Sequence, residues 1–320
     1  FRHDSSAASA GMRLVRPLLL ILTASAGLAS LIAWTTSTGG SDSATQEAEA
    51  LLSALFDSAD QSRSTANFSD HQEGLQRSTA VPAVPPAVAT ADPQLRIALL
   101  SQRPLLQVST QGGAACRSQA GAPVQLGVLN GMITGTTTGL VSCGGSGGSV
   151  FVNGRAYEGT IHLLNRGQGW LAINQINLER YVASVVGAEM PSYWNGEALK
   201  AQAVAARSYG LVHMLRPADR DWNLGDTTRW QAYSGTISST DSTIKAAAAT
   251  RGLVLSFKGG LVESLYAATQ EISDEAHGHL GASMSQHGAQ QLAQRGLRFN
   301  EILGRYYAGA SLARIKTDGQ

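Results

Sequence analysis

Short apolar runs follow one another between residues 93 and 174, and Gly-rich turns such as 144–148 separate them. Runs of this length bounded by turn residues predict strands. The expected strands cover residues 95–100, 104–109, 123–129, 149–152, 157–164 and 168–173. This half of the chain is therefore expected to be rich in β-structure.

The hydrophobic period changes after residue 174. Leu178 and Val182 have helical spacing, Asn174 or Asn177 is positioned to cap the helix, and Gly187 is expected to end it. Further helices are predicted over 196–215, 285–295 and 300–306, and a hairpin over 253–257 and 261–267 around 258–260. The prediction is an α+β fold over residues 93–312, in which the β-rich half (93–174) packs with a helical half (175–312).

The first 92 residues have a different pattern. Arg13 and Arg16 precede an uncharged apolar run over 17–34, which is the order of an export signal. Small residues at 24–26 suit cleavage, yet the run approaches the length of a membrane span, so a signal peptide and a membrane anchor over 12–35 both stay open. Residues 1–11, before Met12, are a candidate over-extended start. Residues 36–92 are rich in Ser, Thr, Ala, Gln and Pro, which predicts a disordered linker.

Export places the folded part outside the cytoplasm, in the cell envelope, either secreted or held at the inner membrane by the N-terminal segment. Cys116 and Cys143 are the two cysteines of the chain. In an exported domain such a pair indicates a disulfide, with free buried thiols as the alternative.

Charged residues make up 15% of the chain and the formal net charge is +1, so no long-range field favours nucleic acid. A neutral polar surface suits sugars instead.

Glu189 is the first candidate for chemistry. Pro191 biases Met190 away from helical angles, so Glu189 is expected in the bend between two helices. Its neighbours are apolar, and a carboxyl in apolar surroundings has a raised pKa, as a general acid near neutral pH requires. The alternative is an ordinary loop glutamate. Lys200 and Arg207, seven residues apart, share one helix face and either serve a site or form a solvated basic stripe.

The stretch 189–209, EMPSYWNGEALKAQAVAARSY, resembles the signature of the SpoIID/LytB family, the stage II sporulation protein D and amidase-enhancer domains. Further matches lie at 226–235, 249–255, 284–289 and 302–307, so the resemblance covers residues 95–312. It implies a lytic transglycosylase that cuts the β-1,4 bond between N-acetylmuramic acid and N-acetylglucosamine in peptidoglycan glycan strands, with Glu189 as the catalytic acid. One carboxyl suffices there, because the 6-hydroxyl of the sugar replaces water as the nucleophile.

The resemblance also implies residues that bind the substrate. Lys200, Gln202 and Arg207 are expected to position it or to hold Glu189, and Gln231 and Tyr233 to bond acetamido or hydroxyl groups. The later motif adds His279, Ser285 and Gln286. Tryptophans at 194, 222 and 230 either stack on sugars or pack in the core.

No cofactor is expected. Some family members bind zinc, and His277, His279 and His287 are candidate ligands here, with separate hydrogen-bonding histidines as the alternative. The chain departs from the family where Glu271 and Ile272 replace two glycines. The alternative function is a non-enzymatic enhancer that binds wall glycan or a cell-wall amidase, followed by a purely structural envelope protein.

Overall fold

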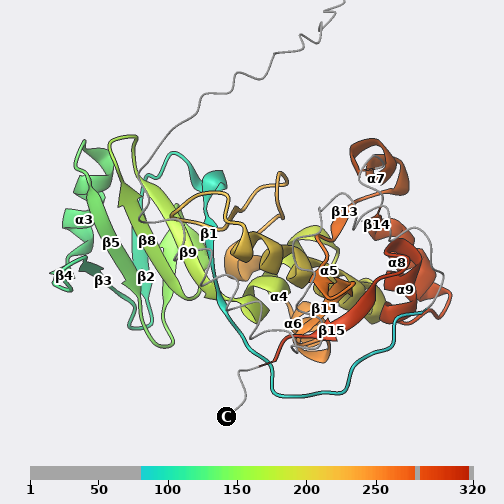
Figure 1. Cartoon of the computed structure of the whole chain (residues 1–320). Coiled ribbons are helices and arrows are strands. Elements are labelled where there is room, and N and C mark those ends of the chain that lie inside the picture. The colour runs from blue at the N-terminus through green and yellow to red at the C-terminus, as the bar shows by residue number, and fades with distance from the viewer. Residues whose placement is uncertain (1–80, 278–281, 317–320) are drawn as a thin grey trace, which may run out of the picture. The chain divides into compact units, whose positions relative to one another are not determined.

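The computed structural model describes residues 81–277 and 282–316, all within the second of the two compact units of the chain, Ser43–Gln320 (Figure 1). The strands are β1 (Gln94–Ala98), β2 (Val108–Gln111), β3 (Ala115–Ser118), β4 (Pro123–Val124), β5 (Gly139–Gly144), β6 (Ser149–Val152), β7 (Arg155–Tyr157), β8 (Thr160–Asn165), β9 (Leu171–Asn177), β10 (Leu224–Gly225), β11 (Leu253–Phe257), β12 (Gly260–Leu261), β13 (Leu265–Ala267), β14 (Ser283–Ser285) and β15 (Ser311–Arg314). The helices are α3 (Leu126–Thr134), α4 (Leu178–Glu189), α5 (Gly196–Leu215), α6 (Asp241–Ala249), α7 (Gln270–His277), α8 (Gln286–Gln294) and α9 (Phe299–Tyr306), with short 3-10 turns η2 (Leu100–Gln102) and η3 (Gly235–Ser238). The predicted α+β class is confirmed.

A seven-stranded sheet in the order β10-β1-β9-β8-β5-β3-β4 forms the β-rich half. Along β8 every second residue is buried, as a strand with one covered face requires. Cys116 on β3 faces Cys143 on β5, and the two form a disulfide, which confirms the first of the two alternatives. A smaller sheet, β2-β6-β7, contacts the large one through β6 and β5.

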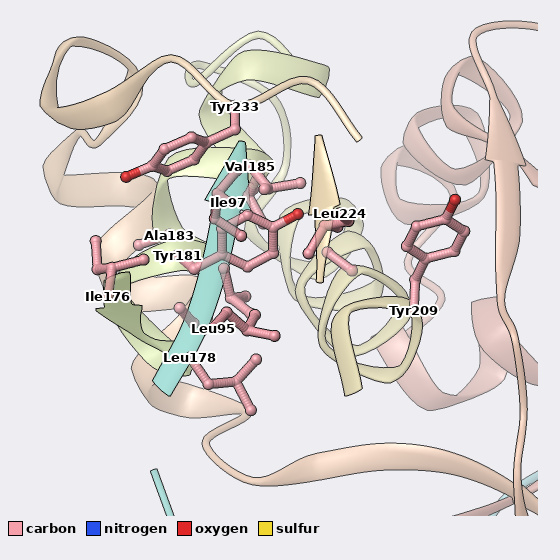
Figure 2. Close-up of a cluster of buried hydrophobic side chains, with 14 of the residues drawn as sticks. Leu95, Ile97, Ile176, Leu178, Tyr181, Ala183, Val185, Tyr209, Leu224 and Tyr233 are labelled. Carbon is pink, nitrogen blue, oxygen red and sulfur yellow. The ribbon is translucent and has the colours of Figure 1, made fainter. Parts of the chain in front are cut away.

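The helical half is built around α5, which packs against α4, α6, α8, α9 and β11. Five alanines between residues 198 and 206 are fully buried, and their small side chains allow neighbours to approach from several sides. Because β10 pairs with β1, this half also contributes the edge strand of the large sheet. Figure 2 shows the shared core, where Leu95 and Ile97 of β1 meet Tyr181 and Val185 of α4.

Two of the predicted strands are wrong. Residues 123–129 form only the two-residue β4 before α3 begins at Leu126, because Leu129 and Ile133 follow a helical period and bury one face. Residues 104–109 are mostly irregular, and β2 begins only at Val108.

Helix α4 does not end at Gly187 but continues to Glu189. A Cβ atom at residue 187 would lie 1.8 Å from the Ser238 carbonyl oxygen, so this glycine permits close packing of α4 on η3 instead of ending the helix. Glu189, which was predicted to lie in the bend between two helices, is therefore the last helical residue, and the bend begins at Met190. The expected hairpin is confirmed for β11 and β12, but β13 leaves it and pairs in parallel with β14.

The predicted segments 1–11 and 12–35, and most of the predicted linker, lie outside the described residues. Within the part that the structure describes, no helix is long and apolar enough to cross a membrane. Residues 81–92, expected as the end of the linker, lie along the helical half. Asn300 donates to the Pro82 carbonyl at 3.0 Å and Arg314 to the Pro85 carbonyl at 3.3 Å. An extended Pro-rich chain leaves its carbonyl groups available for such bonds.

Candidate functional site

Glu189 lies at the C-terminal end of α4, where the chain turns into an extended Met190 (φ −127°, ψ 143°) and then Pro191. Its carboxyl group enters a cleft of about 600 Å³. The lining residues are Glu189, Pro191, Tyr193, Trp194, Ala268, Gln286, His287, Gln290, Gln291 and Gln294. Among these described residues there is no Lys, Arg or Asp, so the groups around Glu189 are mainly amides, aromatic rings and one imidazole.

The Glu189 carboxyl accepts two hydrogen bonds, both from uncharged donors. The Ala232 backbone N–H donates to Oε1 at 2.6 Å, and Gln286 Nε2 donates to Oε2 at 3.2 Å. Burial raises the pKa of this carboxyl above its ordinary value, and the two donors lower it by less. The site therefore favours the protonated acid to a degree that an exposed glutamate does not reach.

Parallel pairing of β13 with β14 assembles the floor of the cleft. Ala267 lies opposite Ser285 in this pair, so the residues that follow, Ala268 and Gln286, enter the cleft together. Ser285 itself is buried and caps α8 by accepting the Gly288 N–H at 3.0 Å. The predicted residue Gln286 thus contacts the acid, and Ser285 orients the helix that carries it.

Gln231 and Tyr233 do not line the cleft and are at most 1% exposed. The Tyr181 hydroxyl donates to Gln231 Oε1 at 2.8 Å, and Gln231 Nε2 donates to the Ala206 carbonyl at 3.3 Å. These bonds hold the residue directly before Ala232, whose N–H reaches Glu189. Tyr233 donates to Asn174 Oδ1 at 2.6 Å, so both predicted sugar contacts bond to protein groups.

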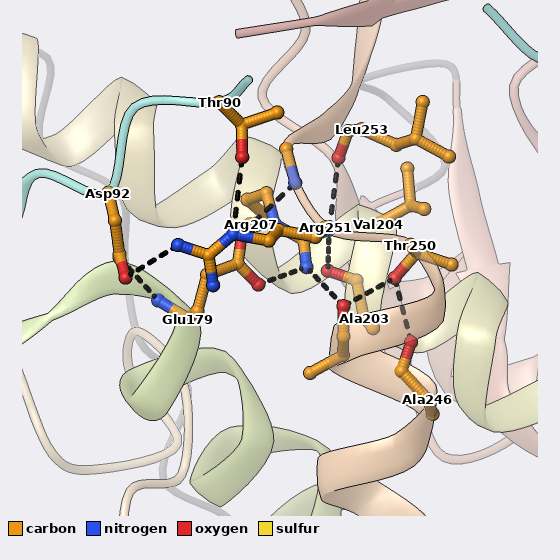
Figure 3. Close-up of polar contacts among 12 residues, drawn as sticks. Thr90, Asp92, Glu179, Ala203, Val204, Arg207, Ala246, Thr250, Arg251 and Leu253 are labelled. Carbon is orange, nitrogen blue, oxygen red and sulfur yellow. Dashed lines mark hydrogen bonds and ion pairs between the residues drawn. The ribbon is translucent and has the colours of Figure 1, made fainter. Parts of the chain in front are cut away.

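Arg207 pairs with Glu179 and not with Glu189 (Figure 3). Its Nε and Nη2 atoms donate to the Glu179 carboxylate at 3.0 and 2.7 Å, and its remaining donors reach the carbonyl groups of Ala203, Ala247 and Leu253. Neither Arg207 nor its partner lines the cleft. A cation with no exposed surface requires such a partner. The ion pair with Glu179 therefore accounts for an arginine at position 207 without any contact to a substrate.

The other cationic and amide candidates on α5 are also apart from Glu189. Lys200 pairs with Glu197 one turn away at 2.7 Å. Gln202 is fully buried, and its amide has no hydrogen-bond partner in the described part of the chain. Trp194 lines the cleft, whereas Trp222 and Trp230 contact each other edge to face at 5.5 Å.

Of the three candidate zinc ligands, the structure describes only the side chain of His287. His287 lines the cleft and its ring lies 4.9 Å from that of Trp194. His279 and the side chain of His277 lie outside the described residues. Within the described ranges, no group of three His, Cys, Asp or Glu side chains is placed to hold a metal ion. The zinc site stays a prediction.

Several residues of the site were not predicted from the sequence. Gln290 and Gln294 follow Gln286 at intervals of four on a helix that the pattern did predict, so this spacing was an available signal. The Ala232 amide left no such signal, because its approach to Glu189 joins positions 43 residues apart.

Comparison with known proteins agrees with the motifs. Residues 166–257 match the family model described as SpoIID, stage II sporulation protein. This region, which carries Glu189 and α5, is therefore similar to the SpoIID family, and the predicted resemblance is confirmed.

Three relatives are similar to part of the chain. An uncharacterized protein of Brachyspira hyodysenteriae is 34% identical over 37% of this chain and 32% of its own length. The amidase enhancer of Bacillus subtilis is 36% identical over 31% of this chain and 13% of its own, and the stage II sporulation protein D of the same organism is 31% identical over 31% and 33%. The chain thus spans a third or less of the length of each relative it matches.

Proposed function

We propose that this protein acts in the cell envelope on peptidoglycan glycan strands, as a lytic transglycosylase with Glu189 as its acid and base. The observation that supports this most is a lone carboxyl with a raised pKa at a neutral cleft. A general acid must hold its proton near the working pH, and burial without a neighbouring cation has this effect.

One carboxyl can perform both halves of the reaction. Protonated Glu189 donates its proton to the glycosidic oxygen as the bond to the anomeric carbon breaks. The resulting carboxylate then accepts the proton of the sugar's 6-hydroxyl, whose oxygen bonds to the same carbon and closes a 1,6-anhydro ring. No water is consumed, so the second carboxylate of hydrolytic glycosidases is not required. The route uses no metal or other cofactor.

The test compares the full chain with two glutamate variants. Wild type, Glu189→Gln and the surface control Glu158→Gln, which removes one partner of an exposed ion pair with Arg180, are incubated with intact peptidoglycan and with peptide-free glycan strands. Mass spectrometry of the products should show 1,6-anhydro-muramic ends with wild type and the control, and a loss of about 10²- to 10⁴-fold with Glu189→Gln. Equal product from all three proteins would exclude Glu189 as the acid.

A second candidate is an enhancer that binds glycan or a cell-wall amidase without cleaving the strand. The similarity to a protein named amidase enhancer favours it. Release of peptide by an added amidase, measured with wild type and Glu189→Gln, separates the two candidates. An enhancer raises release equally in both, whereas a transglycosylase produces anhydro ends without any amidase.

A further inference from the structure

A row of three glutamines runs along the wall of the cleft formed by α8. Gln286, Gln290 and Gln294 are spaced by four residues and all line the cleft. Successive members are offset by about 40° around the helix axis, and the first and third lie about 12 Å apart along it. Because Gln286 contacts Glu189, the row begins at the reacting group and leads away from it.

The amide groups at the start of this row are held in defined orientations. Gln286 uses its nitrogen to donate to Glu189, which leaves its oxygen to accept from a ligand. Gln290 uses its oxygen to accept the Asn195 N–H at 2.9 Å, which leaves its NH₂ group to donate. Two neighbouring amides therefore present opposite hydrogen-bonding groups, as a chain bearing both hydroxyl and acetamido groups requires.

Aromatic side chains also line the cleft. Tyr193 is 86% exposed, and Trp194 beside it lines the cleft. Exposed aromatic rings offer flat apolar faces, which suit the C–H faces of pyranose rings. With no Lys or Arg among the described lining residues, the cleft does not select an anionic ligand.

We propose that Gln286, Gln290 and Gln294, together with Tyr193 and Trp194 of the same cleft, form a binding track for two or more successive sugar units of an N-acetylated β-1,4 glycan on one side of the bond to be cut. This assignment rests on the proposed function for the position of that bond. It places glycan recognition on α8, which lies outside the stretch matched by the family model.

The test measures binding by titration calorimetry of the full chain with N-acetylglucosamine di-, tetra- and hexamers, and mass spectrometry confirms that the ligand stays intact. Wild type should bind the tetramer more tightly than the dimer. Gln294→Ala should remove most of that gain, a loss of about 3- to 10-fold in tetramer affinity for one hydrogen bond. The matched control is Gln168→Ala, in an exposed turn of the β-rich half.

Gln290→Ala is a second variant, accompanied by a thermal unfolding measurement because Gln290 also holds Asn195. The track is overturned if both variants bind every length as wild type does, or if Gln168→Ala weakens binding equally. Length-dependent binding that both variants lose, without anhydro products from peptidoglycan, would support the track and refute the transglycosylase. Cleavage together with wild-type binding by the variants would refute the track alone.

Discussion

Helix α4 carries a glutamate near each end, and the two have opposite environments. Glu179, in the first turn, is 8% exposed and receives two hydrogen bonds from Arg207 and one from the Gly252 N–H. Glu189, the last residue, receives hydrogen bonds from Ala232 and Gln286 within the described ranges, and its pKa is raised by burial.

The two glutamates differ in that Glu179 is paired with a cation, Arg207, whereas no cation is paired with Glu189 among the described residues. A buried carboxylate that accepts two hydrogen bonds from one guanidinium holds the elements that carry the two groups together. A half-buried carboxyl with only neutral donors keeps its proton more readily and is available for acid chemistry. Residue type and helix are the same, so the partners decide between a structural and a chemical role.

The largest effect on stability is expected at the first-turn glutamate. Glu179→Gln leaves the Arg207 charge buried without compensation, which should lower the free energy of unfolding by about 3–5 kcal/mol. The double variant Glu179→Gln with Arg207→Met should recover part of this loss because the uncompensated charge is gone. Urea unfolding followed by circular dichroism measures both. A loss below 1 kcal/mol, as expected for the exposed pair Arg180–Glu158, would contradict the comparison.

A smaller loss is expected at Asp92. Its Oδ1 accepts the Glu179 N–H at 3.0 Å and its Oδ2 pairs with Arg251 at 3.1 Å, so it caps α4 from outside the helix. Asp92→Ala should cost about 1 kcal/mol, the usual value of a lost cap. The same urea measurement checks this, and Asp219→Ala, on a loop of the helical half, is the surface comparison. Unchanged stability would mean that the cap contributes nothing.

Tyr181→Phe tests whether the hydrogen bond from Tyr181 to Gln231 positions the Ala232 N–H on the Glu189 carboxyl. Removing the hydroxyl frees Gln231, which should loosen the Ala232 N–H on the carboxylate and raise the pKa of Glu189 further. Stability should fall by about 1 kcal/mol for the lost hydrogen bond. The ¹³C chemical shift of the Glu189 carboxyl, followed against pH, reports the pKa directly. A titration identical to wild type would show that Tyr181 does not position this group.

The smallest effect is the dependence of stability on pH. Because the pKa of Glu189 is raised on folding, the folded state binds more protons than the unfolded state between the two pKa values. Stability therefore falls as pH rises from the ordinary value of 4.5 through the raised one. Glu189→Gln should flatten this slope and be slightly more stable than wild type at pH 7. The pKa of Asp226 is also raised by burial, so part of the decrease in stability with pH should remain in the variant. Thermal unfolding between pH 4 and 8 measures it, and a steeper slope in the variant would contradict the assignment.

Elements whose boundaries depend on neighbouring residues were predicted well. The pattern predicted α5 with both of its ends, and it predicted α8 and α9 to within one or two residues, because periodicity and end signals act over a few residues. The failures arose where distant partners intervened. Gly187 signals a helix end locally, yet η3 packs against it and α4 continues. Asn177 occupies the predicted N-cap position of α4, but its side chain makes no capping bond, and Asp92 supplies that bond from 87 residues away.

The sequence by itself predicted the resemblance to the SpoIID family, the β-rich and helical halves, and Glu189 as the candidate acid, and it favoured a disulfide over free thiols. Only the tertiary structure decided what each polar group would meet. In the folded protein Arg207 forms an ion pair with Glu179, and Glu189 accepts hydrogen bonds from uncharged donors on two distant segments. One face of α8 lines the cleft that contains Glu189. The reason is that local spacing governs backbone conformation, whereas the pKa and the reactivity of a side chain depend on charges and burial contributed by residues far away in the chain.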